Sequence, residues 1–138
     1  MDAYRLKVLL ADDNLDFLYL LGAIVKQLGH SCISACDGPT AIKKTMEWKP
    51  DLIFCDIGLP GIDGFMVAKT IKQNPEMKKS YVVALTGYAG EHAARRTAES
   101  GFDFYRSKPV SIDDIKQILA VVQTSMATPE QTDEAQSV

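Results

Sequence analysis

The chain has 138 residues, of which 46% are hydrophobic and 24% charged, and its formal net charge is −3. This composition is typical of a globular protein of one domain. No apolar run reaches the roughly 18 residues that a membrane span needs, and the N-terminal residues MDAYRLKVLL do not form a signal peptide. A pI near 5.3 gives no electrostatic basis for binding nucleic acid. We therefore expect a cytoplasmic protein that contacts neither membranes nor nucleic acid.

Short β-rich apolar segments alternate with segments of helical periodicity five times along the chain. In chain order, the predicted strands and the helices that follow them are Leu6–Ala11 and Leu15–Leu28, Ser31–Ala35 and Pro39–Glu47, Leu52–Cys55 and Phe65–Gln73, Tyr81–Leu85 and Glu91–Ser100, and Phe102–Tyr105 and Ile112–Met126. This alternation predicts an α/β fold in which helices cover both faces of a parallel sheet. The third and fourth strands are apolar throughout, as strands covered on both faces must be.

Residues that begin and end helices support this division. Asn14 can cap the first helix and Gly29 can end it, while Pro39 suits the first turn of the second helix. Ser111 and Asp114 form a capping box at the start of the last helix. The boundaries of the predicted helices therefore rest on local chemistry as well as on periodicity.

Polar side chains follow four of the five predicted strands. They are Asp12 and Asp13 after the first strand, Asp56 after the third, Thr86 after the fourth and Lys108 after the fifth. The carboxyl ends of parallel strands meet at one edge of a sheet, where α/β proteins have their binding crevices. Three carboxylates without sulfur ligands suit a hard cation such as Mg²⁺.

Each of these residues also has a purely structural interpretation. Asp12 or Asp13 could cap the following helix, a Thr-Gly pair commonly forms a turn, and a Lys-Pro pair commonly lies in a loop. Their coincidence at the ends of four strands favours one site for a metal ion and a phosphoryl group.

Four pieces of the sequence form one pattern: the pair Asp12–Asp13, the segment PDLIFCDIGLPGIDG around Asp56, the ALTG that contains Thr86, and the SKP that contains Lys108. With this pattern the chain resembles the receiver domain of two-component response regulators, from about Arg5 to Gln123. The resemblance implies a flavodoxin-like (βα)5 three-layer sandwich with strand order 2-1-3-4-5. It also implies a signalling module that is not an enzyme and catalyses only its own phosphorylation and dephosphorylation.

In this resemblance Asp56 is the phosphoacceptor for a phosphohistidine of the partner kinase. Asp13, Asp56 and the backbone carbonyl of Gly58 would hold Mg²⁺ (or Mn²⁺), and Asp12 would bind the ion through water. The ion would compensate the negative charge of the phosphoryl oxygens, as phosphoryl transfer requires.

The resemblance also assigns roles around the phosphoryl group. Lys108 would pair with one phosphoryl oxygen, and Thr86 would move to hydrogen-bond another. Tyr105 corresponds to the switch aromatic that turns inward after Thr86 has moved, although it could instead be a half-buried strand residue. Pro109 would form a cis peptide with Lys108.

Two other classes of protein remain as alternatives. A Mg²⁺-dependent phosphatase with an aspartyl nucleophile would need a second Asp two residues after the nucleophile, where Asp12 is followed by Asp13 and Asn14. A flavin- or nucleotide-binding module would need a Ser-, Thr- or Gly-rich phosphate loop after the first strand, and the two carboxylates there would repel phosphate.

We expect residues 1–126 to form the receiver domain and residues 127–138 a disordered acidic tail. Glu130, Asp133 and Glu134 account for the whole net charge, because the rest of the chain has equal numbers of acids and bases. The chain shows no output domain, so it would be a single-domain response regulator or the receiver of a hybrid histidine kinase. Its expected partners are a sensor histidine kinase or histidine phosphotransfer protein and an unknown downstream protein target.

Overall fold

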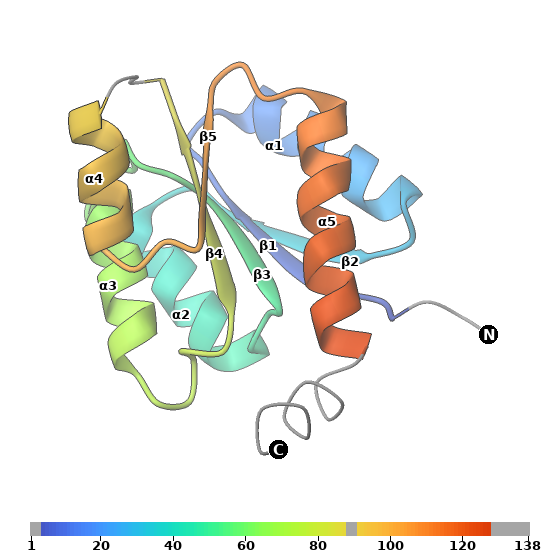
Figure 1. Cartoon of the computed structure of the whole chain (residues 1–138), viewed down its shortest axis with the longest axis horizontal. Coiled ribbons are helices and arrows are strands. Elements are labelled where there is room, and N and C mark those ends of the chain that lie inside the picture. The colour runs from blue at the N-terminus through green and yellow to red at the C-terminus, as the bar shows by residue number, and fades with distance from the viewer. Residues whose placement is uncertain (1–3, 88–90, 128–138) are drawn as a thin grey trace.

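The computed structural model describes residues 4–87 and 91–127 (Figure 1). The strands are β1 (Lys7–Ala11), β2 (Ser31–Ala35), β3 (Leu52–Asp56), β4 (Tyr81–Thr86) and β5 (Phe104–Ser107). The helices are α1 (Leu15–Gln27), α2 (Gly38–Trp48), α3 (Gly64–Gln73), α4 (Glu91–Glu99) and α5 (Ile112–Ala127). The strands form one parallel sheet in the order β2-β1-β3-β4-β5, so the predicted α/β fold and strand order are confirmed.

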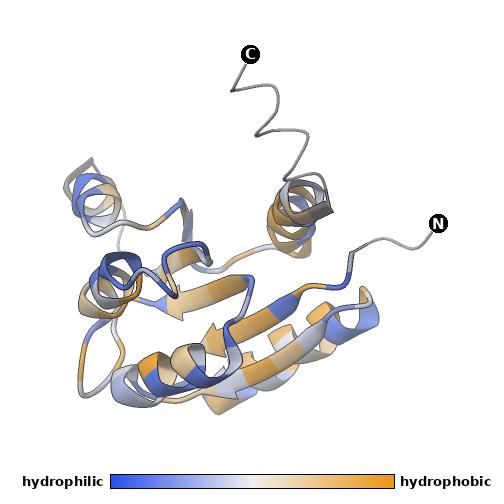
Figure 2. Cartoon of the chain, turned by 90° about the horizontal axis from the view of Figure 1, so that it is seen from below, coloured by the Kyte–Doolittle hydropathy of each residue, from blue (hydrophilic) through white to orange (hydrophobic). Residues whose placement is uncertain are grey.

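Alternation along the buried strands divides the core into two clusters. In β1, Val8 and Leu10 face the cluster that α1 and α5 cover, whereas Leu9 faces the cluster that α2 and α3 cover. β3 and β4 are buried along nearly their whole lengths, because both of their faces lie under helices. Figure 2 shows the same arrangement as hydrophobic strands between helices whose outer faces are hydrophilic. The result is the predicted three-layer sandwich.

Side-chain caps begin the helices near the predicted residues. The Asn14 side chain accepts a hydrogen bond from the Phe17 N–H at 3.1 Å and caps α1. The Ser111 hydroxyl accepts from the Asp114 N–H at 3.0 Å in the predicted capping box. α2 begins one residue earlier than predicted, because Asp37 caps it by accepting from the N–H of Thr40. Asp37 was not among the predicted caps.

The last strand begins two residues later than predicted. The prediction placed Phe102 in the strand, but Phe102 packs edge-on against Phe65 of α3 in the core. Gly101, with φ of 98°, turns the chain into this position, and pairing with β4 starts at Phe104 opposite Val83. The apolar character of Phe102 therefore reflects packing between helix and sheet and not strand pairing.

Two findings bear on the ends of the chain and on membranes. α5 ends at Ala127, and the predicted tail lies almost entirely in residues 128–138, outside the described residues. Among the helices that the structure describes, none has both the length and the apolar character that crossing a membrane requires.

Candidate functional site

The candidate site lies at the carboxyl edge of the sheet, where the predicted polar residues come together. Asp56 is the last residue of β3 and Thr86 the last of β4, and Asp12 and Lys108 follow β1 and β5 directly. The register places Asp56 opposite Leu85. Four strand ends thus deliver side chains from distant parts of the chain to one crevice, as the sequence predicted.

Three carboxylates form the acidic part of the crevice. Oxygen atoms of Asp12, Asp13 and Asp56 all lie within 4.8 Å of one another. Asp12 is buried, Asp56 is partly exposed and Asp13 is exposed, so the cluster opens from the core toward solvent. Asp12 does not cap α1, because its Oδ1 accepts from the Asn14 N–H at 2.9 Å while Asn14 itself is the cap.

Lys108 is the cation of the crevice. Its Nζ donates to Asp12 Oδ2 at 2.8 Å and lies 3.5 Å from Asp56 Oδ1. Its backbone N–H donates to the Thr86 carbonyl at 2.7 Å, which ties the loop after β5 to β4, and its peptide bond to Pro109 is cis. The ammonium also lies 5.1 Å from the ring centroid of Phe17. Lys108 therefore contacts two of the three carboxylates at once.

These groups perturb one another electrostatically. Burial and then the charge of Asp12 raise the pKa of Asp56, against the opposing effects of Lys108 and the Gly58 backbone N–H. Burial disfavours the charged form of Lys108, but hydrogen bonding to Asp12 and the charges of Asp12 and Asp56 outweigh it and raise the pKa of Lys108. One ammonium thus does not fully compensate the negative charge of the cluster, and a further cation would be favourable.

The donor set fits a hard divalent cation. It consists of carboxylate oxygens of Asp12, Asp13 and Asp56, which lie close enough together to share one ion. A Cβ added at Gly58 would lie 3.8 Å from Asp56 Oδ2, so it would face the carboxylate without clashing. Glycine at this position leaves the approach to Asp56 open, and the φ of Gly58 does not lie in the left-handed region.

Thr86 and Tyr105 lie on the β4–β5 side of the crevice. The Thr86 side chain is 1% exposed. Tyr105 pairs with Ala84 in the sheet and packs, half-buried, against the core cluster under α2 and α3. Both predicted switch residues therefore lie in packed surroundings, and the Thr86 backbone is directly hydrogen-bonded to Lys108.

Sequence reasoning missed two residues that shape this site. Phe17 of α1, assigned no role beyond helical periodicity, lies beside the ammonium of Lys108. A Cβ at Gly64 would lie 2.6 Å from the Asp56 carbonyl oxygen, so only glycine lets α3 approach the end of β3. The Asp63–Gly64 pair was the available signal, because Asp63 also caps α3.

The fold and the crevice together define a class: a doubly wound α/β module with an acidic cluster and a lysine at the carboxyl edge of its sheet. The family described as the response regulator receiver domain matches residues 8–120. The chain belongs to this family, whose members are receiver domains of two-component systems and work with histidine kinases or phosphotransfer proteins.

Curated relatives agree with this assignment. The chain is 31% identical to the polar-differentiation response regulator DivK of Brucella anthropi over 105 residues, which are 76% of this chain and 85% of DivK. It is 39% identical over 106 residues to a gliding motility regulatory protein of Myxococcus xanthus. That match covers 77% of this chain but spans only 14% of the longer relative.

Solved structures have the same fold. The chemotaxis response regulator CheY4 of Vibrio cholerae superposes with a TM-score of 0.81 at 22% identity, covering 86% of this chain and 99% of CheY4. The signal receiver domain of a histidine kinase from Syntrophus aciditrophicus also gives a TM-score of 0.81 at 22% identity, covering 87% and 91% of the two chains. At these identities the likeness concerns the fold alone.

Proposed function

We propose that this chain accepts a phosphoryl group on Asp56 from a phosphohistidine of a sensor histidine kinase or histidine phosphotransfer protein. The observation that carries the proposal is the position of Asp56, whose partly exposed carboxylate lies 3.5 Å from Lys108 and within one acidic cluster with Asp12 and Asp13. A nucleophile fixed at a strand end beside a cation meets the two requirements of phosphoryl transfer, alignment and charge compensation.

The transfer would take place in line. An Oδ atom of Asp56 forms the new bond to phosphorus while the bond from phosphorus to the donor imidazole nitrogen breaks, and that nitrogen leaves with the bonding electron pair. Asp13, Asp56 and the carbonyl of Gly58 would hold Mg²⁺ (or Mn²⁺), with Asp12 bound through water. When bound, the ion supplies positive charge against the phosphoryl oxygens.

Lys108 would exchange partners during this step. In the free protein its ammonium is shared by Asp12 at 2.8 Å and Asp56 at 3.5 Å. A phosphoryl group on Asp56 would bring more negative charge and more acceptor oxygens into its reach. Its contact with Asp12 holds the ammonium in place beforehand, which lowers the cost of ordering it.

The output would be a change of surface on the β4–β5 side. Thr86 would move to hydrogen-bond a phosphoryl oxygen, and the ring of Tyr105 would settle inward as Thr86 moves. The ring of Tyr105 already packs against the core cluster. The proposed change is therefore a closer packing of this ring and not a first contact with the core. A downstream protein target would read the altered surface in the cytoplasm.

Mass spectrometry of the intact protein with a small phosphodonor tests the proposal. With Mg²⁺ present, the wild type should gain one phosphoryl group, whereas Asp56→Asn should gain none. Chelation of Mg²⁺ should prevent the gain in the wild type. Asp63→Asn is a matched control, because Asp63 lies in the following loop and caps α3; it should still be labelled.

The same assay separates the proposal from an aspartyl-nucleophile phosphatase. A receiver takes up one phosphoryl group per chain, whereas a phosphatase releases phosphate from an aryl phosphate over many turnovers. Labelling on a Ser or His, or multiple turnover without stable labelling of Asp56, would contradict the proposed function.

A further inference from the structure

The outer side of the edge strand β2, away from the aspartate crevice, carries backbone groups that do not take part in the sheet. β2 pairs with β1 on one side and is the terminal strand of the sheet. In a parallel sheet a residue directs both backbone groups to one neighbour and the next residue directs both to the other side. The Ser31 N–H donates to the Leu6 carbonyl and the Ala35 carbonyl accepts from the Asp12 N–H. Odd-numbered residues of β2 therefore bond to β1.

Cys32 and Ser34 consequently direct their backbone groups to the open edge. Among the described residues, one of these four groups has a hydrogen-bond partner: the Ser34 carbonyl accepts from Lys44 Nζ at 2.6 Å. The N–H and C=O of Cys32 and the N–H of Ser34 remain available to an added strand. Lysine over one carbonyl is typical of edge strands that must not pair indiscriminately.

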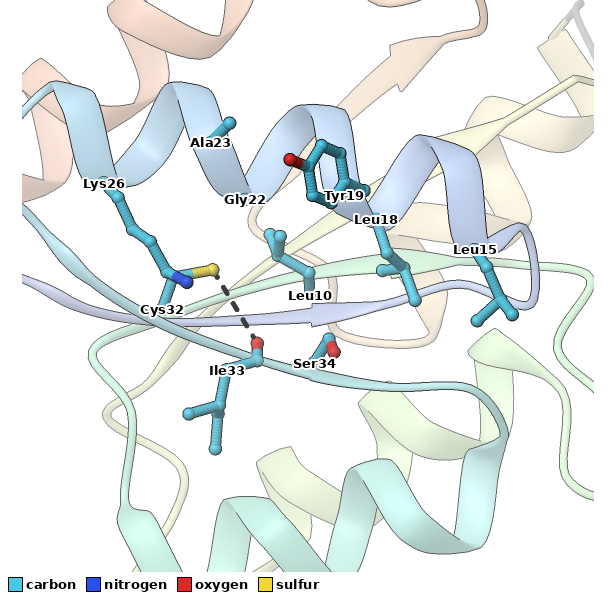
Figure 3. A pocket seen from close by; sticks show the side chains of 10 residues that line it. All are labelled: Leu10, Leu15, Leu18, Tyr19, Gly22, Ala23, Lys26, Cys32, Ile33 and Ser34. Carbon is cyan, nitrogen blue, oxygen red and sulfur yellow. Dashed lines mark hydrogen bonds between the residues drawn. The ribbon is translucent and has the colours of Figure 1, made fainter.

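A hollow lies beside this edge on each face of the sheet. The hollow between α1 and β2 has a volume of about 460 Å³. Leu10, Leu18 and Cys32 form its floor, and Tyr19 and Lys26 flank it (Figure 3). On the opposite face a hollow of about 340 Å³ is lined by Ile33, Lys44, Glu47 and Trp48. Side chains of a strand alternate between the faces of its sheet. Successive side chains of an added strand would therefore meet the two hollows in turn.

Gly22 helps to form the larger hollow. It lies within α1, where glycine lowers helix stability relative to alanine. A Cβ at this position would lie 3.8 Å from Leu10 Cδ1 and 3.9 Å from Cys32 Sγ, which are ordinary contacts. Packing within this chain therefore does not require the glycine. The glycine leaves space above the Cys32 thiol. Burial raises the pKa of this thiol to about 11, so the floor of the hollow is uncharged at neutral pH.

The residues around the two hollows indicate what kind of segment would bind there. Tyr19 is 82% exposed and Leu15 66% exposed, which gives the α1 side an apolar rim. Lys26 stands on one face and Lys44 with Glu47 on the other, whereas β2 carries no charge. The excess of lysine favours acidic residues in the occupant. A second copy of this chain, paired edge to edge through β2, would bring these lysines to one seam, where they would repel each other.

We propose that the β2 edge binds an extended segment of a partner protein as a sixth strand, with apolar side chains entering the hollow beside Gly22 and acidic residues meeting Lys26 and Lys44. Backbone hydrogen bonds to Cys32 and Ser34 supply affinity, and the two hollows supply selectivity. This surface is separate from Asp56, so the segment binds whether or not the proposed phosphorylation takes place.

The test is a titration of the full chain with a synthetic peptide in which pairs of Val alternate with pairs of Glu, followed by ¹H–¹⁵N NMR. In this pattern each face of the added strand carries both Val and Glu. The amides of Cys32 and Ser34 should shift together. A peptide with the same residues in two blocks, and one with Lys in place of Glu, should bind at least about tenfold more weakly. Shifts confined to other parts of the chain, or equal binding of all three peptides, would overturn the proposal.

Variants separate strand addition from nonspecific binding of the peptide. Ser34→Pro removes an outward N–H and no bond to β1, so it should abolish binding while the protein stays folded. Ser31→Pro is the matched control, because it removes the N–H that bonds to Leu6 and should lower the melting temperature. Gly22→Ala should raise the melting temperature and weaken binding about threefold or more by filling the hollow.

Two further results bear on the occupant. Lys26→Gln should weaken binding, whereas Lys43→Gln, on the exposed side of α2, should leave it unchanged. Self-association of the wild type that Ser34→Pro abolishes would show a second copy at this edge and would overturn the proposed partner.

Discussion

Aspartates lie both at the amino ends and at the carboxyl ends of the parallel strands, but their surroundings differ. These two ends of the strands are called the amino edge and the carboxyl edge of the sheet. At the amino edge, Asp103 accepts from the Val82 N–H and from Lys72, both at 2.8 Å, and Asp51 accepts from the Lys7 N–H at 2.9 Å. At the carboxyl edge, Asp12, Asp13 and Asp56 crowd together around Lys108. The first edge joins strands to neighbouring loops, whereas the second keeps negative charge that its surroundings do not fully compensate. Carboxylates whose charge is compensated by donors stabilise the fold, whereas the crowded carboxylates of the crevice keep uncompensated charge that can serve chemistry.

Removal of a scaffold carboxylate should have the largest effect on stability. Asp103→Ala deletes charge-assisted hydrogen bonds to β4 and α3, and we expect it to lower the free energy of unfolding by about 2 kcal/mol. Chemical denaturation measures this change. Glu99→Ala, which removes an exposed acid at the end of α4, should stay within about 0.5 kcal/mol of the wild type. If the two variants were equally stable, the amino edge would not be the scaffold described here.

Removal of a crevice carboxylate should act in the opposite direction. Burial raises the pKa of Asp56 above its unfolded value, so the ionised group costs stability at neutral pH and this cost disappears as the pH falls below both values. Without divalent cations, Asp56→Asn should therefore raise the free energy of unfolding by about 1 kcal/mol. Millimolar Mg²⁺ should stabilise the wild type more than the variant. A destabilised variant would mean that the crevice is as well compensated as the amino edge.

The smallest effect should come from a buried histidine at the amino edge. His30 Nδ1 accepts from the Leu6 N–H at 3.0 Å, and burial and then the charge of Arg5 lower the pKa of His30. The stabilisation that neutral His30 provides is complete above the pKa of the unfolded state, near 6.5. It is lost as the pH falls toward the lower pKa of the folded state.

His30→Asn keeps an acceptor but does not titrate. The loss of unfolding free energy between about pH 7.5 and pH 5 should shrink by up to about 1 kcal/mol relative to the wild type. Equal pH dependence of the two proteins would show that His30 does not stay neutral at this edge.

The contrast between the edges was only half predictable from the sequence. Residues after buried parallel strands must meet at the carboxyl edge, so the convergence of Asp12, Asp56 and Lys108 followed from strand assignment alone. The roles of Asp51 and Asp103 did not, because a residue before a strand carries no pattern that separates a hydrogen-bonded acid from a solvated one.

Other details depend on three-dimensional packing. Phe102 has the composition of a strand residue, and only the turn at Gly101 and its contact with Phe65 place it outside β5. Likewise, nothing in the sequence indicates that Lys108 lies closer to Asp12 than to Asp56. The hollow beside Gly22 depends on the distance between α1 and β2, which periodicity does not encode.

The most direct test of the contrast is to follow backbone amides by ¹H–¹⁵N NMR while Mg²⁺ and then a small phosphodonor are added. We predict that shifts concentrate at Asp13, Asp56, Gly58, Thr86 and Lys108, and that Asp56→Asn loses the response to the phosphodonor. Amides of Lys7 and Val82 at the amino edge should change little. Comparable shifts at both edges, or a crevice that does not respond, would contradict the account.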